Sequence, residues 1–149
     1  MSEILDRLMA QISAIARRVA HLETLEGGGG GVVERREIVF SGENDLTTGE
    51  KPLRIYPPTG DWTIEKVRAA VETAPGTQAA IFDIHLNGVT IFTDQNKRAQ
   101  IAAVAKLDDS DTPDITAMDG DDYLQLGVDQ IGTGTVGADG TIHVIFVAA

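Results

Sequence analysis

The chain has 149 residues, of which 42% are hydrophobic and only 5% aromatic, and its formal net charge is −11. This length suits one modest domain with an appendage, and the core must consist mainly of Val, Ile, Leu and Ala. The negative charge would repel a phosphate backbone or an anionic membrane surface, and no apolar run approaches the length of a membrane span. We therefore expect neither nucleic-acid binding nor membrane insertion. The absence of cysteine excludes disulfides and thiolate chemistry, which fits a chain made in a reducing cytoplasm.

Residues 4–26 carry an apolar stripe that repeats every seven residues, as in a coiled coil. The a positions are Leu5, Ile12 and Val19, and the d positions are Leu8, Ile15 and Leu22. Isoleucine at both a and d favours three or more helices over two, and a single helix of this length is marginal in water. The alternative is an amphipathic helix packed on its own domain. The narrow repeat and the glycine run at 27–31 argue against that alternative.

The end of this helix carries a second signal for a trimer. The residues Arg18-Val19-Ala20-His21-Leu22-Glu23 resemble the Arg-h-x-x-h-Glu signature of short trimeric coiled coils. Arg18 falls at a g position and Glu23 at the following e position, so the pair can bridge neighbouring helices. We therefore expect a parallel homotrimer with a stalk at 1–26, a Gly-rich linker and neck at 27–36, and a head domain at 37–149.

After the glycines the periodicity becomes that of β-strands. We expect strands at 32–40, 53–56, 63–73, 81–86, 89–92, 101–107, 115–117, 123–131 and 141–147, with a loop at 41–52 and a turn at Asp139-Gly140. The clearest local signal is Asn87-Gly88 between two alternating runs, because a type I′ hairpin turn needs positive φ at both central residues. This series of short strands, with no helix after the stalk, predicts an antiparallel β-sandwich or jelly roll.

Several of these segments resemble a module of bacteriophage tail-fibre and other virion surface proteins. They are Leu53 to Tyr56, Thr63 to Pro75, Asp83 to Phe92, Asp119 to Leu124 and Val128 to Gly132. The resemblance covers roughly residues 53–147 and involves mainly strand and turn residues, and Asp122 is an insertion relative to the expected shorter turn. It implies an all-β head, usually trimeric, on a phage particle, and it supplies no catalytic residues to carry over.

The resemblance implies a virion structural protein of the tail-fibre or head-fibre type, made in the cytoplasm of the bacterial host. Its partners would be other virion proteins, bound through the stalk, and a glycan or protein of the host cell surface. The alternative is a capsid-decoration or tail and baseplate protein that stabilises the particle without contacting the host. An enzyme or small-ligand protein is a third interpretation, for which we find no motif.

Individual polar and aromatic residues give few functional signals. Trp62 follows a predicted loop, where its ring could contact a sugar or a neighbouring subunit, or could simply cover the edge of the sandwich or the trimer interface. His21, His85 and His143 lack metal-site spacing, although His85 and His143 could meet across strands. We expect no metal and no cofactor.

Two acidic segments are the remaining candidates. Their carboxylates are Asp108, Asp109, Asp111 and Asp114 in one segment, and Asp119, Asp121 and Asp122 in the next. Carboxylate oxygens are the ligands that Ca²⁺ prefers, but Asp and Gly are also common in solvated turns, and the other ligands of an EF-hand loop are missing. A glycosidase would need an aromatic-lined groove, whereas the chain has one Trp and two Tyr.

Overall fold

The computed structural model describes residues 33–149. The chain divides into two compact units, Met1–Glu34 and Arg35–Ala149. The expected stalk residues lie outside the described range; they are Leu5, Leu8, Ile12, Ile15, Arg18, Val19, Leu22 and Glu23. The coiled coil and the trimer therefore stay predictions.

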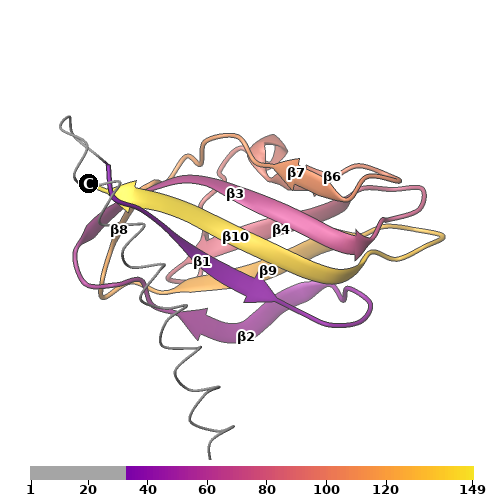
Figure 1. Cartoon of the computed structure of the whole chain (residues 1–149), viewed down its shortest axis with the longest axis horizontal. Coiled ribbons are helices and arrows are strands. Elements are labelled where there is room, and N and C mark those ends of the chain that lie inside the picture. Colours follow the sequence, from indigo (N-terminus) through magenta and orange to yellow (C-terminus); the bar gives the residue numbers. More distant parts are fainter. Residues whose placement is uncertain (1–32) are drawn as a thin grey trace, which may run out of the picture. The chain divides into compact units, whose positions relative to one another are not determined.

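The second unit is built from β-strands (Figure 1). In chain order, its elements are β1 (Arg35–Ser41), β2 (Gly49–Ile55), β3 (Asp61–Thr73), β4 (Ala80–Leu86), β5 (Val89–Thr90), the 3-10 turn η1 (Gln95–Lys97), β6 (Ala99–Ile101), β7 (Leu107–Asp109), β8 (Ala117–Asp119), β9 (Leu124–Ile131) and β10 (Ala138–Ala148). None of the helical structure in the described range is long and apolar enough to cross a membrane.

The strands form two five-stranded antiparallel sheets. In sheet A the order is β1-β10-β3, and both β7 and β8 pair with the far edge of β3. In sheet B the order is β2-β9-β4, and both β5 and β6 pair with β4. Figure 1 shows β1, β10 and β3 side by side in front of β9 and β4.

This order is that of a jelly roll. If β5 with β6, and β7 with β8, are each taken as one interrupted strand, the eight resulting strands lie in the orders 1-8-3-6 and 2-7-4-5. Two interlocked Greek keys produce this arrangement. The predicted jelly-roll-like antiparallel sandwich is therefore confirmed for the described residues.

The core lies between the two sheets, and strand alternation explains which residues fill it. On β10, the inward side chains Ile142, Val144 and Phe146 are buried, while the residues between them are partly exposed. The aliphatic core predicted from composition is present. It also contains every phenylalanine of the chain and its single tryptophan: Phe40, Phe82, Phe92, Phe146 and Trp62.

Three local predictions were wrong. β2 begins at Gly49 and contains Pro52, which we had placed in a loop. Proline is tolerated there because β2 is an edge strand and its register shifts between Glu50 and Arg54. The single strand expected at 101–107 is broken, because the chain reverses at Val104, whose φ is +60°.

The third wrong prediction concerns Asp139-Gly140, which lies within β10 rather than at a turn that bounds it. Asp139 has a φ of +53°, and its carboxylate accepts a hydrogen bond from the backbone N–H of Asn44 at 2.7 Å. In contrast, the Asn87-Gly88 hairpin turn is confirmed, with φ of +52° and +84°.

The sandwich has two distinct ends. At the entry end, Arg35 of β1 pairs with Val147 of β10. At the far end, Ser41 pairs with Thr141. Four loops meet at the far end, at residues 42–48, 74–79, 102–106 and 132–137. Backbone hydrogen bonds join these loops: Leu46 N–H to Gly137, Gly76 N–H to Thr135, Thr77 N–H to Thr133 and Val104 N–H to Pro75.

Candidate functional site

Trp62, a candidate recognition residue, is a core side chain. It lies in β3 rather than in a loop and is only 5% exposed. Its indole N–H donates a hydrogen bond to the carbonyl of Pro58 at 2.8 Å, and its ring packs edge to face on Phe146, with 5.2 Å between centroids. The ring therefore has little surface to offer to a ligand.

The two described histidines do not meet. His85 lies on β4 of sheet B, and His143 lies on β10 of sheet A, where its Nδ1 is 3.0 Å from a carboxylate oxygen of Glu37. Across residues 33–149, no group of three or more His, Cys, Asp or Glu side chains is arranged to hold a metal ion.

Two carboxylates of the first acidic segment, those of Asp109 and Asp114, are engaged within the fold. Asp109 accepts two hydrogen bonds from the Arg68 guanidinium, at 2.6 and 2.9 Å, and one from Lys66 at 2.7 Å. These donors hold the pKa of Asp109 well below its usual value, with Arg68 contributing most. Lys97 and a backbone N–H lower the pKa of Asp114 to about 2. Both carboxylates therefore hold neighbouring parts of the fold together.

Ion pairs lie on the outer face of sheet A, between the adjacent strands β3 and β7 and, across β10, between β1 and β3. Besides the Asp109 pairs, Arg35 of β1 donates two hydrogen bonds to Glu65 of β3, at 2.8 and 3.0 Å. Exposed pairs of this kind contribute little to stability, but they leave the cations of this face matched by carboxylates. The face is that of a solvated sheet.

The outer face of sheet B is different, because it combines aromatic rings with a cation. Arg54 lies on β2, and Tyr56 follows two residues later, on the same side of the chain. The ring of Tyr123, just before β9, lies with its centroid 6.0 Å from that of Tyr56, at an interplanar angle of 59°. The Arg54 guanidinium carbon is 4.5 Å from the Tyr123 ring centroid. We call Arg54, Tyr56 and Tyr123 the tyrosine cluster.

The hairpin turn between β4 and β5 holds the tyrosine cluster in place. The Asn87 side chain accepts a hydrogen bond from the Tyr123 backbone N–H at 3.0 Å and donates one to Asp122 at 2.6 Å. The Asn87 N–H also donates to the Tyr123 carbonyl at 3.0 Å. A Cβ at Gly88 would lie 3.7 Å from the Tyr123 hydroxyl oxygen, so the turn packs closely against this ring.

A second polar group lies farther along the same face. His85 Nε2 is 3.4 Å from an oxygen of Asp83, and its Nδ1 is 3.1 Å from Glu50. Asp83 is only 4% exposed, and burial raises its pKa, while it accepts a hydrogen bond from the Thr90 hydroxyl at 2.8 Å. Thr90 donates to Asp83 and not to His85, so the nucleophile-to-histidine hydrogen bond of a catalytic triad is not formed here.

A small apolar cavity of about 270 Å³ lies between the sheets, beneath the loop at 42–48. Its walls include Phe40 and Ile142 from sheet A and Phe82 and Leu126 from sheet B. This volume lies just below the usual range for small-molecule sites, and the lining is shared between core side chains and the loop at 42–48.

The tyrosine cluster was missed from the sequence. Alternation on a strand places Arg54 and Tyr56 on one face, but the sequence does not show that β2 pairs with β9. In the structure, that pairing sets Arg54 opposite Gln125, two residues after Tyr123.

Comparison with known proteins finds no family model that matches this sequence and no match among curated proteins. Among solved structures, the chain is similar to one in the cyanophage Pam1 capsid asymmetric unit, with 12% identity, a TM-score of 0.46 and coverage of 82% of this chain and 89% of that one. It is also similar to the infectious bursal disease virus VP2 subviral particle and to the virus of the Gx strain. The subviral particle matches with 12% identity and a TM-score of 0.35, over 77% of this chain and 33% of that one. The Gx strain matches with 12% identity and a TM-score of 0.31, over 78% of this chain and 34% of that one. The jelly-roll assignment itself follows from the strand order.

Proposed function

We propose that this chain is a structural protein of a bacteriophage particle, of the trimeric tail-fibre or head-fibre type, with a head that attaches to the host surface. The proposed organisation is a stalk at 1–26, a linker and neck at 27–36 and a jelly-roll head at 37–149. The jelly-roll strand order and the resemblance of residues 53–147 to virion surface modules support this proposal. We assign the head no catalytic role.

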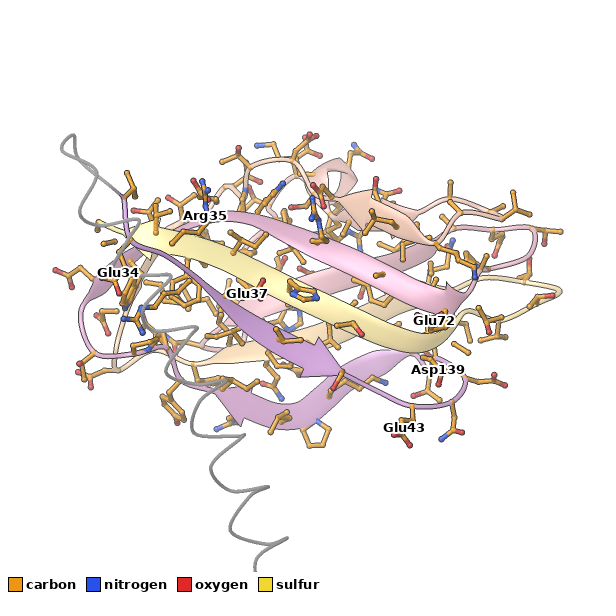
Figure 2. All side chains as sticks on the ribbon, viewed as in Figure 1. Glu34, Arg35, Glu37, Glu43, Glu72 and Asp139 are labelled. Carbon is orange, nitrogen blue, oxygen red and sulfur yellow. The ribbon has the colours of Figure 1, made fainter. Side chains whose placement is uncertain are left out.

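The proposal rests mainly on one observation: the start of β1 and the end of β10 lie at the same end of the sandwich. Arg35 and Val147 pair with each other at the entry end. In the proposal the entry end would connect to the rest of the particle, while the far end and the outer faces of the sheets, including the part of sheet B where β2 ends, would face a partner. Figure 2 shows Glu43, Glu72 and Asp139 at the end opposite Arg35, so the far end presents several carboxylates.

A trimer would suit attachment for a further reason. Three heads on one stalk multiply individually weak contacts, because each later contact forms at a high effective concentration. The joined loops of the far end also lose little conformational entropy on binding, since backbone hydrogen bonds already order them.

The test uses the purified full-length protein, labelled with a fluorophore, and cells of a susceptible and a resistant bacterial strain. We expect binding to the susceptible cells, and we expect antibodies against the protein to block adsorption of the phage. No binding to susceptible cells, together with antibodies that leave adsorption intact, would contradict the proposal.

The second candidate function is architectural, in the capsid shell or the tail. The net charge of −11 and the matched ion pairs on sheet A suit an abundant, soluble outer component of a particle. This function predicts that deletion of the gene lowers particle yield or stability and leaves the adsorption of surviving particles unchanged.

A further inference from the structure

Among the described residues, the arginine of the tyrosine cluster differs from three other arginines, which each pair with a carboxylate. Arg35, Arg68 and Arg98 each form an ion pair with an acidic side chain. Within the described range, the contact found for Arg54 is with the Tyr123 ring, and no carboxylate forms an ion pair with it. In a chain with a net charge of −11, an exposed arginine without a carboxylate is suited to an anionic ligand.

The aromatic residues of the chain divide sharply between core and surface. All five phenylalanine and tryptophan rings are buried in the core. Both tyrosines of the chain lie together on the outer face of sheet B, and Tyr56 is 58% exposed. Exposing an aromatic ring to water is unfavourable in free energy, and a ligand that covers the ring removes this contact with water.

We propose that the tyrosine cluster binds a saccharide that carries a carboxylate group. The ring of Tyr56 would pack on the C–H face of the sugar, and the Arg54 guanidinium would pair with the carboxylate through two parallel hydrogen bonds. This inference rests on the proposed attachment function and names the class of ligand for one surface, the outer face of sheet B where β2 ends and β9 begins, which lies at the entry end and apart from the far-end loops.

The surroundings favour a singly charged sugar over a phosphate group. Asp122 lies beside the cluster through its hydrogen bond to Asn87, and Glu50 lies on the same strand as Arg54. These carboxylates would repel a doubly charged group more than a singly charged one. A sugar ring also uses the exposed Tyr56 face, which a bare anion would leave uncovered.

The hairpin turn anchors Tyr123 of the cluster before any ligand binds. Asn87 fixes the backbone on both sides of the Tyr123 peptide, and the Tyr123 ring supports the Arg54 side chain from below. Little side-chain entropy is then lost on binding, which matters because a single sugar makes a small contact.

The experiment compares two ligands that differ only in the carboxylate, methyl β-D-glucuronide and methyl β-D-glucoside. Their binding to the full-length protein is measured by saturation-transfer NMR and by ligand titration. We expect the glucuronide to bind about tenfold more tightly, as one exposed charge-assisted contact would give. We expect Arg54→Gln to remove this preference and Tyr56→Ala to abolish binding of both sugars.

Two control variants test whether an effect belongs to the cluster. Leu53→Ala changes an exposed side chain on the same strand, and Arg35→Gln removes an arginine from the outer face of sheet A. Both should bind the glucuronide as the unaltered protein does. Equal affinity for the two sugars, loss of binding in either control, or a change in oligomeric mass caused by Tyr56→Ala would each overturn the inference. The last result would identify the cluster as a contact between copies of the chain.

The outcomes also separate this inference from the proposed function. If the unaltered protein binds susceptible cells and neither sugar, the inference fails and the attachment function stands. If it binds the glucuronide but no cells, the ligand class stands and the attachment function fails.

Discussion

Replacing Trp62 with alanine tests whether this ring belongs to the core, where the structure places it. The ring is 5% exposed, packs edge to face on Phe146 and donates one hydrogen bond to the carbonyl of Pro58. Removing a buried aromatic side chain costs about 3–5 kcal/mol, because the transfer energy is lost and a cavity is left. Domains of this size have total stabilities of about 5–15 kcal/mol, so the loss is a large fraction.

A milder variant separates the contribution of the hydrogen bond to this loss of stability from the contribution of packing. Trp62→Phe keeps most of the ring but loses the indole N–H, whose hydrogen bond contributes about 1 kcal/mol. We therefore expect Trp62→Phe to lower the free energy of unfolding by about 1–2 kcal/mol and Trp62→Ala to lower it by about 3–5 kcal/mol.

The assay is urea unfolding followed by far-ultraviolet circular dichroism, because both variants remove the only tryptophan of the chain. Tyr56→Ala, which truncates a ring that is 58% exposed, is the matched control and should change stability by less than about 1 kcal/mol. A Trp62→Ala variant as stable as this control would refute the core position of the ring and would indicate that the ring lies at the surface.

Two further predictions concern the ion pairs and the far-end loops. The pKa of Asp109 lies below its usual value of 3.8 in the folded protein, so the stability it contributes is present above that value and is lost as the pH falls below it. Asp109→Asn should therefore be less stable than the unaltered protein near neutral pH, and the difference should shrink steadily as the pH falls from about 4 towards 2; a constant difference would contradict the role of the charge. Gly132→Ala should cost about 1–3 kcal/mol, because Gly132 has a φ of +89° and the new Cβ would lie 2.7 Å from the Cβ of Pro75. Gly42→Ala, whose Cβ would meet nothing within 4 Å, is its control, and equal losses in the two variants would contradict the close packing of these loops.

The sequence predicted those strands whose pattern is local. Alternation of apolar residues identified β9 and β10, and together with the all-β surroundings it identified β3, a segment rich in helix formers. The Asn87-Gly88 pair identified the hairpin, because only a few residue types accept positive φ at both positions. The order of the strands in each sheet depends on pairings between distant segments, and the count of short strands indicated only the general class of fold.

The wrong predictions have tertiary causes. A valine with positive φ is unfavourable by itself, and Val104 adopts this conformation where its N–H bonds to the carbonyl of Pro75. Pro52 is acceptable in β2 only because that strand lies at the edge of its sheet. Neither circumstance can be recognised from neighbouring residues.

The candidate site could also be predicted only in part, because it depends on the pairing of distant strands. Alternation places Arg54 with Tyr56, and it places Tyr123 with Gln125, but their meeting follows from the pairing of β2 with β9. Trp62 attracted attention as a single tryptophan after a turn, yet alternation along β3 directs it into the core.

The central claim is that three copies assemble through the heptad residues of the first 26 positions. Sedimentation equilibrium of the full-length protein tests it most directly. The claim predicts a mass three times the 15.8 kDa of one chain, and a lower mass when Ile12 and Ile15 are both replaced by aspartate. A monomer at every concentration, or a trimer that survives the double substitution, would contradict it.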